Sequence, residues 1–219
     1  MLASASARLH TAPMEWIAHR GAAYDAPENS LEAFERAIGQ SAPRIEVDVQ
    51  ISADGVLFIH HDADTARCAD RRLVIGTSTS DELRAVRLAN GEGLPTFDET
   101  CRLVAGRAEL DVELKATSLV MVSRVLAALA EHGLLERVLV TSFHAPSLAE
   151  ARRLGYSGRL GLIVGSRSLK PSQRLFEAWP LRAMRRCGAD ALALHHKLAH
   201  APLVRSLRAS GTPLYLWGA

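Results

Sequence analysis

The sequence has little cysteine, few aromatic residues and no long apolar run, and each shortage excludes a class of protein. Its three cysteines, Cys68, Cys101 and Cys187, are odd in number and far apart, so they form neither a disulfide framework nor a paired metal motif. No apolar stretch approaches the roughly 20 residues that span a bilayer. The first fifteen residues lack the continuous apolar core of a secretory signal. These absences favour a reduced, cytoplasmic setting without stable membrane insertion.

An excess of charge of one sign is also missing. The chain has 26 Lys and Arg against 24 Asp and Glu, and the net charge of +2 gives no reason to expect a nucleic-acid partner. Arg182, Arg185 and Arg186 have helical spacing and are interpreted as a solvated helix face. A length of 219 residues suits one domain with a large core. We expect residues 16–219 to form that domain, after an N-terminal extension of residues 1–15.

Apolar runs alternate with amphipathic stretches, which is the pattern of parallel beta-alpha units. Eight strands are expected, at residues 16–19, 45–51, 56–61, 109–115, 138–143, 159–163, 191–194 and 213–217. Four glycines are interpreted as left-handed caps at helix C-termini: Gly133, Gly155, Gly188 and Gly211. Asn29, with Glu32 three residues later, is interpreted as the N-cap of the first helix. The pattern predicts an α/β fold, a TIM (β/α)8 barrel.

Residues 63–95 interrupt this alternation with many charged and small residues. We interpret them as a small insertion after the third strand, with one short helix around residues 81–88. Because the insertion leaves from the carboxyl end of a strand, it is expected near the mouth of the barrel, where active sites of this fold lie. A lid that selects the substrate and simple surface decoration are both compatible with its sequence.

Charged residues gather at the ends of the expected strands. Successive side chains of a strand face opposite ways, so Glu46 and Asp48 share one face. By the same parity Asp111, Glu113 and Lys115 share a face of another strand. Carboxylates that face each other in an interior repel one another and lose solvation unless a cation lies between them. A positive group is therefore expected among these acids.

Short motifs follow one another in a fixed order, many at expected strand ends: His19-Arg20-Gly21, Pro27-Glu28-Asn29-Ser30, Glu46-Val47-Asp48-Val49-Gln50, Asp54-Gly55, His61-Asp62, Leu94-Pro95-Thr96 and Glu113-Leu114-Lys115. This series resembles the glycerophosphodiester phosphodiesterase (glycerophosphoryl diester phosphodiesterase) family, and the likeness extends weakly through Ser142-Phe143 to Trp217. The resemblance implies a phosphoric diester hydrolase. Its small-molecule substrates would be glycerophosphodiesters, hydrolysed to sn-glycerol 3-phosphate and an alcohol.

The resemblance also implies roles for individual residues. Glu46, Asp48 and Glu113 would bind a divalent cation, Mg²⁺ or Ca²⁺, because oxygen ligands suit hard ions. Arg20 and Lys115 would hold the phosphate. In the alternative interpretation, the three acids simply form a salt-bridge network with these two cations.

His19 and His61 would be the general base and the general acid of the implied reaction. His60 faces the other way if the strand is regular, and is interpreted as packing or rim. The route could pass through a cyclic phosphate formed by the glycerol 2-hydroxyl, or through direct attack by water. Trp217, at the end of the eighth strand, would pack against glycerol, although core packing alone would explain it.

The sequence departs from the family in two places. After His61-Asp62 it contains Arg67-Cys68-Ala69, where the family has an arginine followed by threonines. The chain stops at Gly218-Ala219, where the family has a further helix after the eighth strand. Without that helix, the outer faces of the first and last strands would be left exposed. We expect residues 1–15 or another subunit of a homo-oligomer to cover them, unless the chain is a truncated product.

Two other activities remain open. The first is an impaired, truncated barrel that binds glycerophosphodiesters without turnover. The second is a metal-independent phosphoinositide-cleaving barrel, against which the three aligned carboxylates argue.

Overall fold

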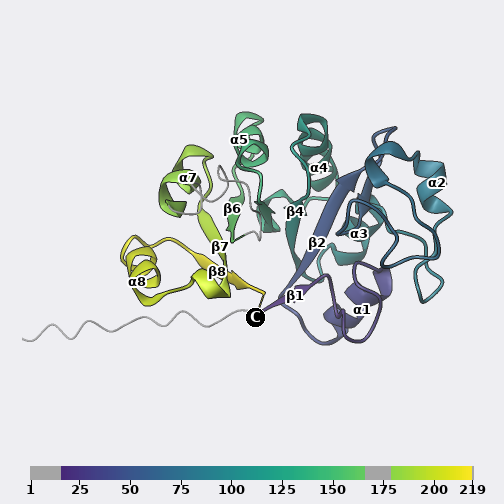
Figure 1. Cartoon of the computed structure of the whole chain (residues 1–219), viewed down its shortest axis with the longest axis horizontal. Coiled ribbons are helices and arrows are strands. Elements are labelled where there is room, and N and C mark those ends of the chain that lie inside the picture. Colours follow the sequence, from purple (N-terminus) through teal and green to yellow (C-terminus); the bar gives the residue numbers. More distant parts are fainter. Residues whose placement is uncertain (1–15, 166–178, 219) are drawn as a thin grey trace, which may run out of the picture.

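The computed structural model describes residues 16–165 and 179–218, so the expected extension of residues 1–15 lies outside the described residues. Within those ranges, seven parallel strands form a curled sheet in the order β1-β2-β4-β5-β6-β7-β8 (Figure 1). The strands are β1 (Ile17–His19), β2 (Arg44–Ile51), β4 (Glu109–Leu114), β5 (Val138–Ser142), β6 (Arg159–Val164), β7 (Ala191–His195) and β8 (Leu214–Trp217). The fold is that of a TIM barrel, as the sequence predicts.

The third expected strand forms, but its predicted place in the parallel wall is wrong. β3 (Leu57–Ile59) runs antiparallel to β2, with Val49 opposite Ile59 and Ile51 opposite Leu57. The chain reverses at Gly55, whose φ of +89° is the left-handed conformation that a tight turn requires. β4 consequently pairs directly with β2. β3 therefore lies beside the wall and not within it.

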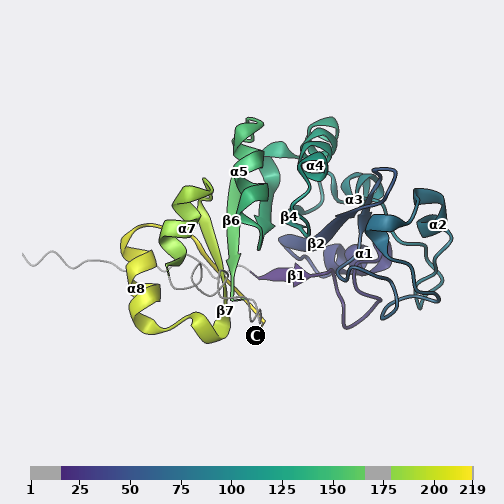
Figure 2. The ribbon, with the colours of Figure 1, turned by 45° about the horizontal axis from the view of Figure 1, so that its top comes forward.

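Helices surround the outside of the curled sheet (Figures 1 and 2). They are α1 (Leu31–Gly39), α2 (Ser80–Arg84), α3 (Phe97–Val104), α4 (Leu119–Glu131), α5 (Ala145–Arg153), α7 (Pro180–Arg186) and α8 (Ala201–Ala209). Single 3-10 turns are η1 (Ile75–Thr77), η2 (Leu135–Arg137) and η3 (His196–Leu198). All four glycines expected as helix caps have positive φ angles, between +66° and +87°. No helix of the described ranges is both long and apolar enough to cross a bilayer.

The core lies between the sheet and its helices. Alternate strand residues such as Val47, Val49, Val112 and Leu114 are buried there against the helices. Residues of opposite parity point inward, and the register places Glu46 beside Asp111 and Asp48 beside Glu113. Strand parity thus sends the apolar side chains to the helices and the acids to the barrel interior.

The segment after β3 has a separate apolar cluster. Its members are buried and come from β3 and the stretch that follows: Phe58, Ile75, Leu83, Val86, Leu88 and Leu94. The expected short helix is α2, which begins one residue earlier and ends four residues earlier than predicted. A capping box between Thr79 and Glu82 fixes its start. Residues 63–95 therefore have packing of their own beside the barrel wall.

β1 and β8 are the two ends of the hydrogen-bonded path. Trp16 before β1 and Leu216 in β8 are each about half exposed. A hydrogen bond of 3.3 Å from Arg44 Nη1 to the Tyr215 hydroxyl joins β2 to β8. Ile17 of β1 and Tyr215 of β8 also line the same pocket, so the two edges of the sheet border one cavity.

Candidate active site

A pocket of about 650 Å³ opens at the carboxyl ends of the strands. Its lining includes every residue expected at the site except Asp48: His19, Arg20, Glu46, His61, Glu113, Lys115 and Trp217. Asp48 is fully buried beside it. The structure thus brings together side chains from β1, β2, β4, β8 and the turn that follows β3.

Three carboxylates form a cluster at this pocket. Glu46, Asp48 and Glu113 can each offer one oxygen such that the three atoms lie within 4.8 Å of one another. Burial, and then the neighbouring Asp48, raise the pKa of Glu46 well above its usual value. Burial and Asp48 likewise raise the pKa of Glu113. Keeping this cluster ionised requires compensating positive charge.

Two protein cations supply part of that charge. Lys115 Nζ lies 2.8 Å from Asp48 Oδ1 and 2.7 Å from Glu113 Oε1. Arg20 Nε lies 3.3 Å from Asp48 Oδ2. Burial would raise the pKa of Asp48, but Lys115 and Arg20 outweigh it and hold that pKa below its usual value. The salt-bridge network of the alternative interpretation is therefore present around Asp48 and Glu113.

Glu46 is the least compensated of the three acids. It accepts a hydrogen bond of 2.9 Å from the Arg20 backbone amide and lies 3.9 Å from His19 Nε2. Asp48 Oδ1, although close to Lys115, is buried and receives no hydrogen bond of good geometry within the described residues. An all-oxygen cluster with spare acceptor capacity fits a hard divalent cation such as Mg²⁺ or Ca²⁺.

Two histidines line the same pocket as the carboxylates, and a third lies nearby. The side chain of His19, at the end of β1, is 69% exposed. Its pKa is nevertheless lowered, first by partial desolvation of the ring and then by the charge of the adjacent Arg20. His61 Nδ1 lies 2.7 Å from Asp62 Oδ1, which leaves Nε2 as the nitrogen available for proton transfer. His60 is buried with its Nε2 3.0 Å from the Asp64 carbonyl oxygen, so it has a packing role.

Arg67, to which the sequence analysis assigned no role, contacts residues beside the pocket. Its guanidinium donates to both oxygens of Glu28, at 2.7 and 2.8 Å, and its Nε donates to Asp62 Oδ2 at 2.6 Å. Glu28 also accepts a hydrogen bond of 2.8 Å from Arg20 Nη1. The hydrogen bond from Arg67 lowers the pKa of Glu28 to about 2. Arg67 thus links Asp62, which contacts His61, to Glu28, which contacts Arg20. We call this connection the Arg67 bridge.

Asn29 was expected to cap the first helix, and that expectation is wrong. The N-cap of α1 is Ser30, whose side chain accepts from the Ala33 amide. Asn29 has a φ of +57° and turns its amide inward, donating from Nδ2 to Asp48 Oδ2 at 2.8 Å. The left-handed conformation, which asparagine tolerates, directs this side chain into the site.

The far wall of the pocket is aromatic. Trp217 packs edge-on against Phe143, with ring centroids 5.5 Å apart, and against His195 at 4.7 Å. Its indole nitrogen lies 3.3 Å from the carbonyl oxygens of both Val164 and Ala193. These contacts fix the ring and leave an apolar surface toward the pocket.

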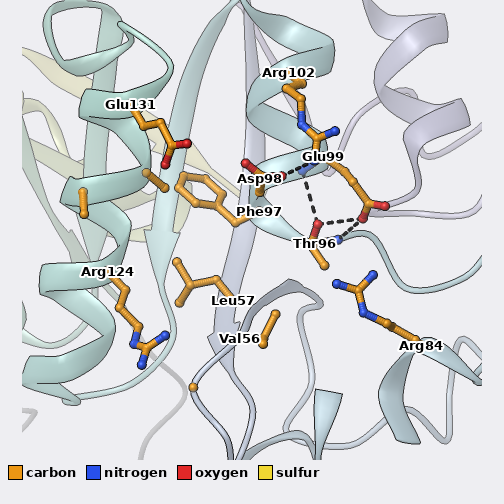
Figure 3. Close-up of a pocket in the computed structure, with 13 residues that line it drawn as sticks. Val56, Leu57, Arg84, Thr96, Phe97, Asp98, Glu99, Arg102, Arg124 and Glu131 are labelled. Atoms are coloured by element: carbon orange, nitrogen blue, oxygen red, sulfur yellow. Dashed lines mark hydrogen bonds and ion pairs between the residues drawn. The ribbon is translucent and has the colours of Figure 1, made fainter. Parts of the chain in front are cut away.

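A different hollow, of about 400 Å³, lies outside the barrel between α3, α4 and the turn before β3 (Figure 3). Part of its charged lining is engaged: Arg102 is paired with Asp98, and Glu99 accepts from Thr96. Neither histidine expected in the site lines it. The carboxylates and histidines instead converge at the pocket on the strand ends.

The sequence profile of the glycerophosphoryl diester phosphodiesterase family matches residues 19–219. The chain belongs to this family. A glycerophosphodiester phosphodiesterase from Caldanaerobacter subterraneus subsp. tengcongensis is 28% identical over 92% of this chain and 84% of its own length. The crystal structure of a glycerophosphodiester phosphodiesterase from Parabacteroides distasonis matches with a TM-score of 0.77 and 26% identity, covering 93% of this chain and 83% of that one.

A third similar protein is an Oleispira antarctica phosphodiesterase, solved in complex with the product sn-glycerol-3-phosphate. It matches with a TM-score of 0.83 and 24% identity over 94% of this chain and 85% of that one. Family membership makes this chain a phosphodiesterase that hydrolyses glycerophosphodiesters.

Proposed function

We propose that this chain hydrolyses glycerophosphodiesters to sn-glycerol 3-phosphate and an alcohol, in a reaction that depends on a divalent cation. The observation that carries the proposal is a single pocket lined by two carboxylates of the cluster, two cations and two histidines, with the third carboxylate, Asp48, buried beside it. The product bound to the Oleispira antarctica phosphodiesterase supports the choice of sn-glycerol 3-phosphate.

Arg20 and Lys115 bind the phosphate in this proposal. Burial lowers the affinity of the Lys115 amine for its proton, but Asp48 and Glu113 more than compensate, so its pKa is raised and the amine stays charged. A divalent cation held by Glu46, Asp48 and Glu113 would neutralise charge on the phosphoryl oxygens. The planar fork of Arg20 gives the phosphate a defined orientation.

His19 and His61 move the protons. In the route that uses the glycerol 2-hydroxyl, one histidine removes the hydroxyl proton as the oxygen attacks phosphorus. The other donates a proton to the alcohol oxygen as its bond to phosphorus breaks. Water then opens the cyclic phosphate, with the same two groups in exchanged roles. Direct attack by water would form no cyclic phosphate, so ³¹P NMR during turnover distinguishes the two routes.

The first test is release of sn-glycerol 3-phosphate from glycerophosphocholine, with Mg²⁺ or Ca²⁺ and then with a chelator. Turnover that the chelator abolishes is expected. His19→Ala and His61→Ala should each lower turnover by about a hundredfold or more. His132→Ala is the control, because His132 pairs with Asp98 outside the barrel. Substrate binding without turnover would instead favour a binding-only barrel, and turnover resistant to chelation would favour the metal-independent reaction.

The segment 63–95 contributes to this site in our proposal as more than decoration. It supplies Arg67, which contacts Glu28 and Asp62 beside the pocket. We therefore treat it as an insertion within the domain of residues 16–219 that helps to shape the substrate site.

A further inference from the structure

The nearly balanced net charge of the chain hides a strong segregation of charge along it. Residues 151–219 contain 12 Lys and Arg but only 2 Asp and Glu, whereas residues 1–150 contain 14 and 22. The last third of the sequence is thus strongly basic and the remainder acidic. Such a distribution creates a directional electrostatic field even when the total charge is small.

The structure gathers part of this basic charge on two neighbouring helices. α7 and α8 lie side by side on the outer surface in both views (Figures 1 and 2). Their exposed arginines form what we call the basic face: Arg182, Arg185, Arg186, Arg205 and Arg208. Within the described residues, none of these five arginines forms an ion pair, and Asp190, four residues after Arg186, is paired with Arg152.

An apolar hollow lies between the N-terminal ends of these helices. It has a volume of about 590 Å³ and includes Trp179, Pro180, Leu181 and Leu203 together with the α7 arginines. Trp179 is 61% exposed, which is unusual for a ring of that size. Because the helix N-termini follow the carboxyl ends of the strands, this hollow lies toward the same end of the barrel as the active site.

We propose that the basic face docks on an anionic phospholipid membrane surface. Unpaired arginines attract anionic headgroups, and a tryptophan beside aliphatic side chains suits the boundary between headgroups and acyl chains. The inference is independent of the reaction proposed above.

Two other binding partners would account for fewer features of this surface. A nucleic-acid backbone would use the arginines but would leave the aliphatic part of the hollow without a partner. A second copy of this chain would have to offer its acidic part, where many acids, including Glu28, Asp98 and Glu109, are already ion-paired internally. An anionic bilayer matches both the charge and the apolar hollow.

Cosedimentation of the full chain with vesicles tests the proposal. The vesicles contain phosphatidylcholine alone or phosphatidylcholine with phosphatidylglycerol, at low and high salt. We expect binding to the anionic vesicles only, weakened by salt. R182Q/R185Q/R186Q should weaken binding by about fivefold per arginine, or about a hundredfold in total. Brominated lipid should quench tryptophan fluorescence, and W179F should lose that quenching.

The matched control is R71Q/R84Q/R124Q, which removes the same charge from exposed positions in the acidic part of the chain. It should keep most of the binding. Circular dichroism melting of each variant shows whether it is folded, and W179F keeps the net charge unchanged. Equal loss in both triple variants, equal binding to neutral vesicles, tighter binding to an oligonucleotide, or self-association without vesicle binding would each overturn the proposal.

Discussion

At the scale of single residues, the candidate site is in contact with groups that do not themselves line the pocket. Arg67 contacts Glu28 and Asp62, which in turn contact Arg20 and His61. One guanidinium therefore holds both Glu28, the partner of the residue proposed to bind phosphate, and Asp62, the partner of a residue proposed to transfer protons. Because planar bidentate contacts define angles as well as distances, lysine cannot reproduce this geometry.

Breaking the Arg67 bridge should impair catalysis more than binding. We expect Arg67→Ala to lower kcat by up to about a hundredfold, because small misplacements of catalytic groups have effects of that size. Arg67→Lys should restore part of the loss. ¹⁵N NMR of His61 should show a mixture of tautomers in the alanine variant, a change that general destabilisation would not cause. Unchanged kcat with a raised KM would show that Arg67 only binds substrate.

The carboxylates of the Arg67 bridge should also make the free energy of unfolding depend on pH in the acid range. The pKa of Glu28 is lowered from 4.5 to about 2, so its contribution is complete above pH 4.5 and is lost as pH falls toward 2. Glu28→Gln should flatten the decline in unfolding free energy over that range, measured by urea denaturation. Glu131→Gln, which removes an acid without a described ion pair, should leave the decline as in the parent. A decline equally steep in Glu28→Gln would contradict this account.

Sequence parity was sufficient for the residues that lie on strands. Glu46, Asp48 and Glu113 converge because neighbouring parallel strands in register place their inward residues side by side, and Lys115 directly follows β4 with the same parity. Asn29 could not be assigned in this way, since its direction depends on one left-handed φ angle. Arg67 reaches a carboxylate 39 residues away in sequence, and no local pattern predicts that contact.

At the scale of elements, the connection from β1 to α1 positions Arg20 in the site and α1 against the strand. Arg20 and Gly21 have φ angles of +58° and +81°, and this turn directs the Arg20 amide to Glu46. A Cβ on Gly21 would lie 2.8 Å from the Ala33 backbone in α1. The helix can approach the strand closely only because this position lacks a side chain.

Gly21→Ala should therefore destabilise the fold by more than about 1 kcal/mol, since it adds an unfavourable φ to a backbone clash. Gly39→Ala is the matched control, because nothing lies within 4 Å of its added methyl at the end of α1. It should leave stability unchanged or raise it by up to about 1 kcal/mol. Urea denaturation at constant m-value measures both. Similar effects from the two substitutions would show that the close approach is unimportant.

The order of elements was predictable, but the direction of one strand was not. Apolar periodicity located β3 in the sequence. It could not give the direction of the strand, because a strand has the same pattern in either direction. Its antiparallel pairing follows from a short reversal at Gly55, which leaves no room for the crossover helix that a parallel neighbour needs. From the sequence pattern alone, this segment was expected to be the third of eight parallel strands.

At the scale of the whole molecule, the proposed metal ligands come from only two strands, β2 and β4. A cation bound there would stabilise the folded chain alone, because the unfolded chain does not hold the three acids together. At a hundred times its Kd the cation should add about 2.7 kcal/mol, or about 5 to 10 °C in Tm.

Differential scanning fluorimetry with Mg²⁺, Ca²⁺ and a chelator measures this stabilisation without any assay of activity. Glu113→Gln should lose the metal-dependent rise in Tm. Glu109→Gln removes an acid from the other end of the same strand and should keep that rise. A rise of equal size in both variants would place the cation elsewhere.

The packing of the segment after β3 has a consequence for how this molecule can change. His61, Asp62 and Arg67 belong to a stretch whose apolar cluster is distinct from the main core. Mutations there can accumulate without disturbing the wall that holds the acids. We expect that a laboratory library confined to residues 63–95, with Arg67 kept, could exchange one leaving-group preference for another while the residues proposed to bind the phosphate stay in place. In evolution, we expect the barrel wall and the segment of residues 63–95 to change at different rates.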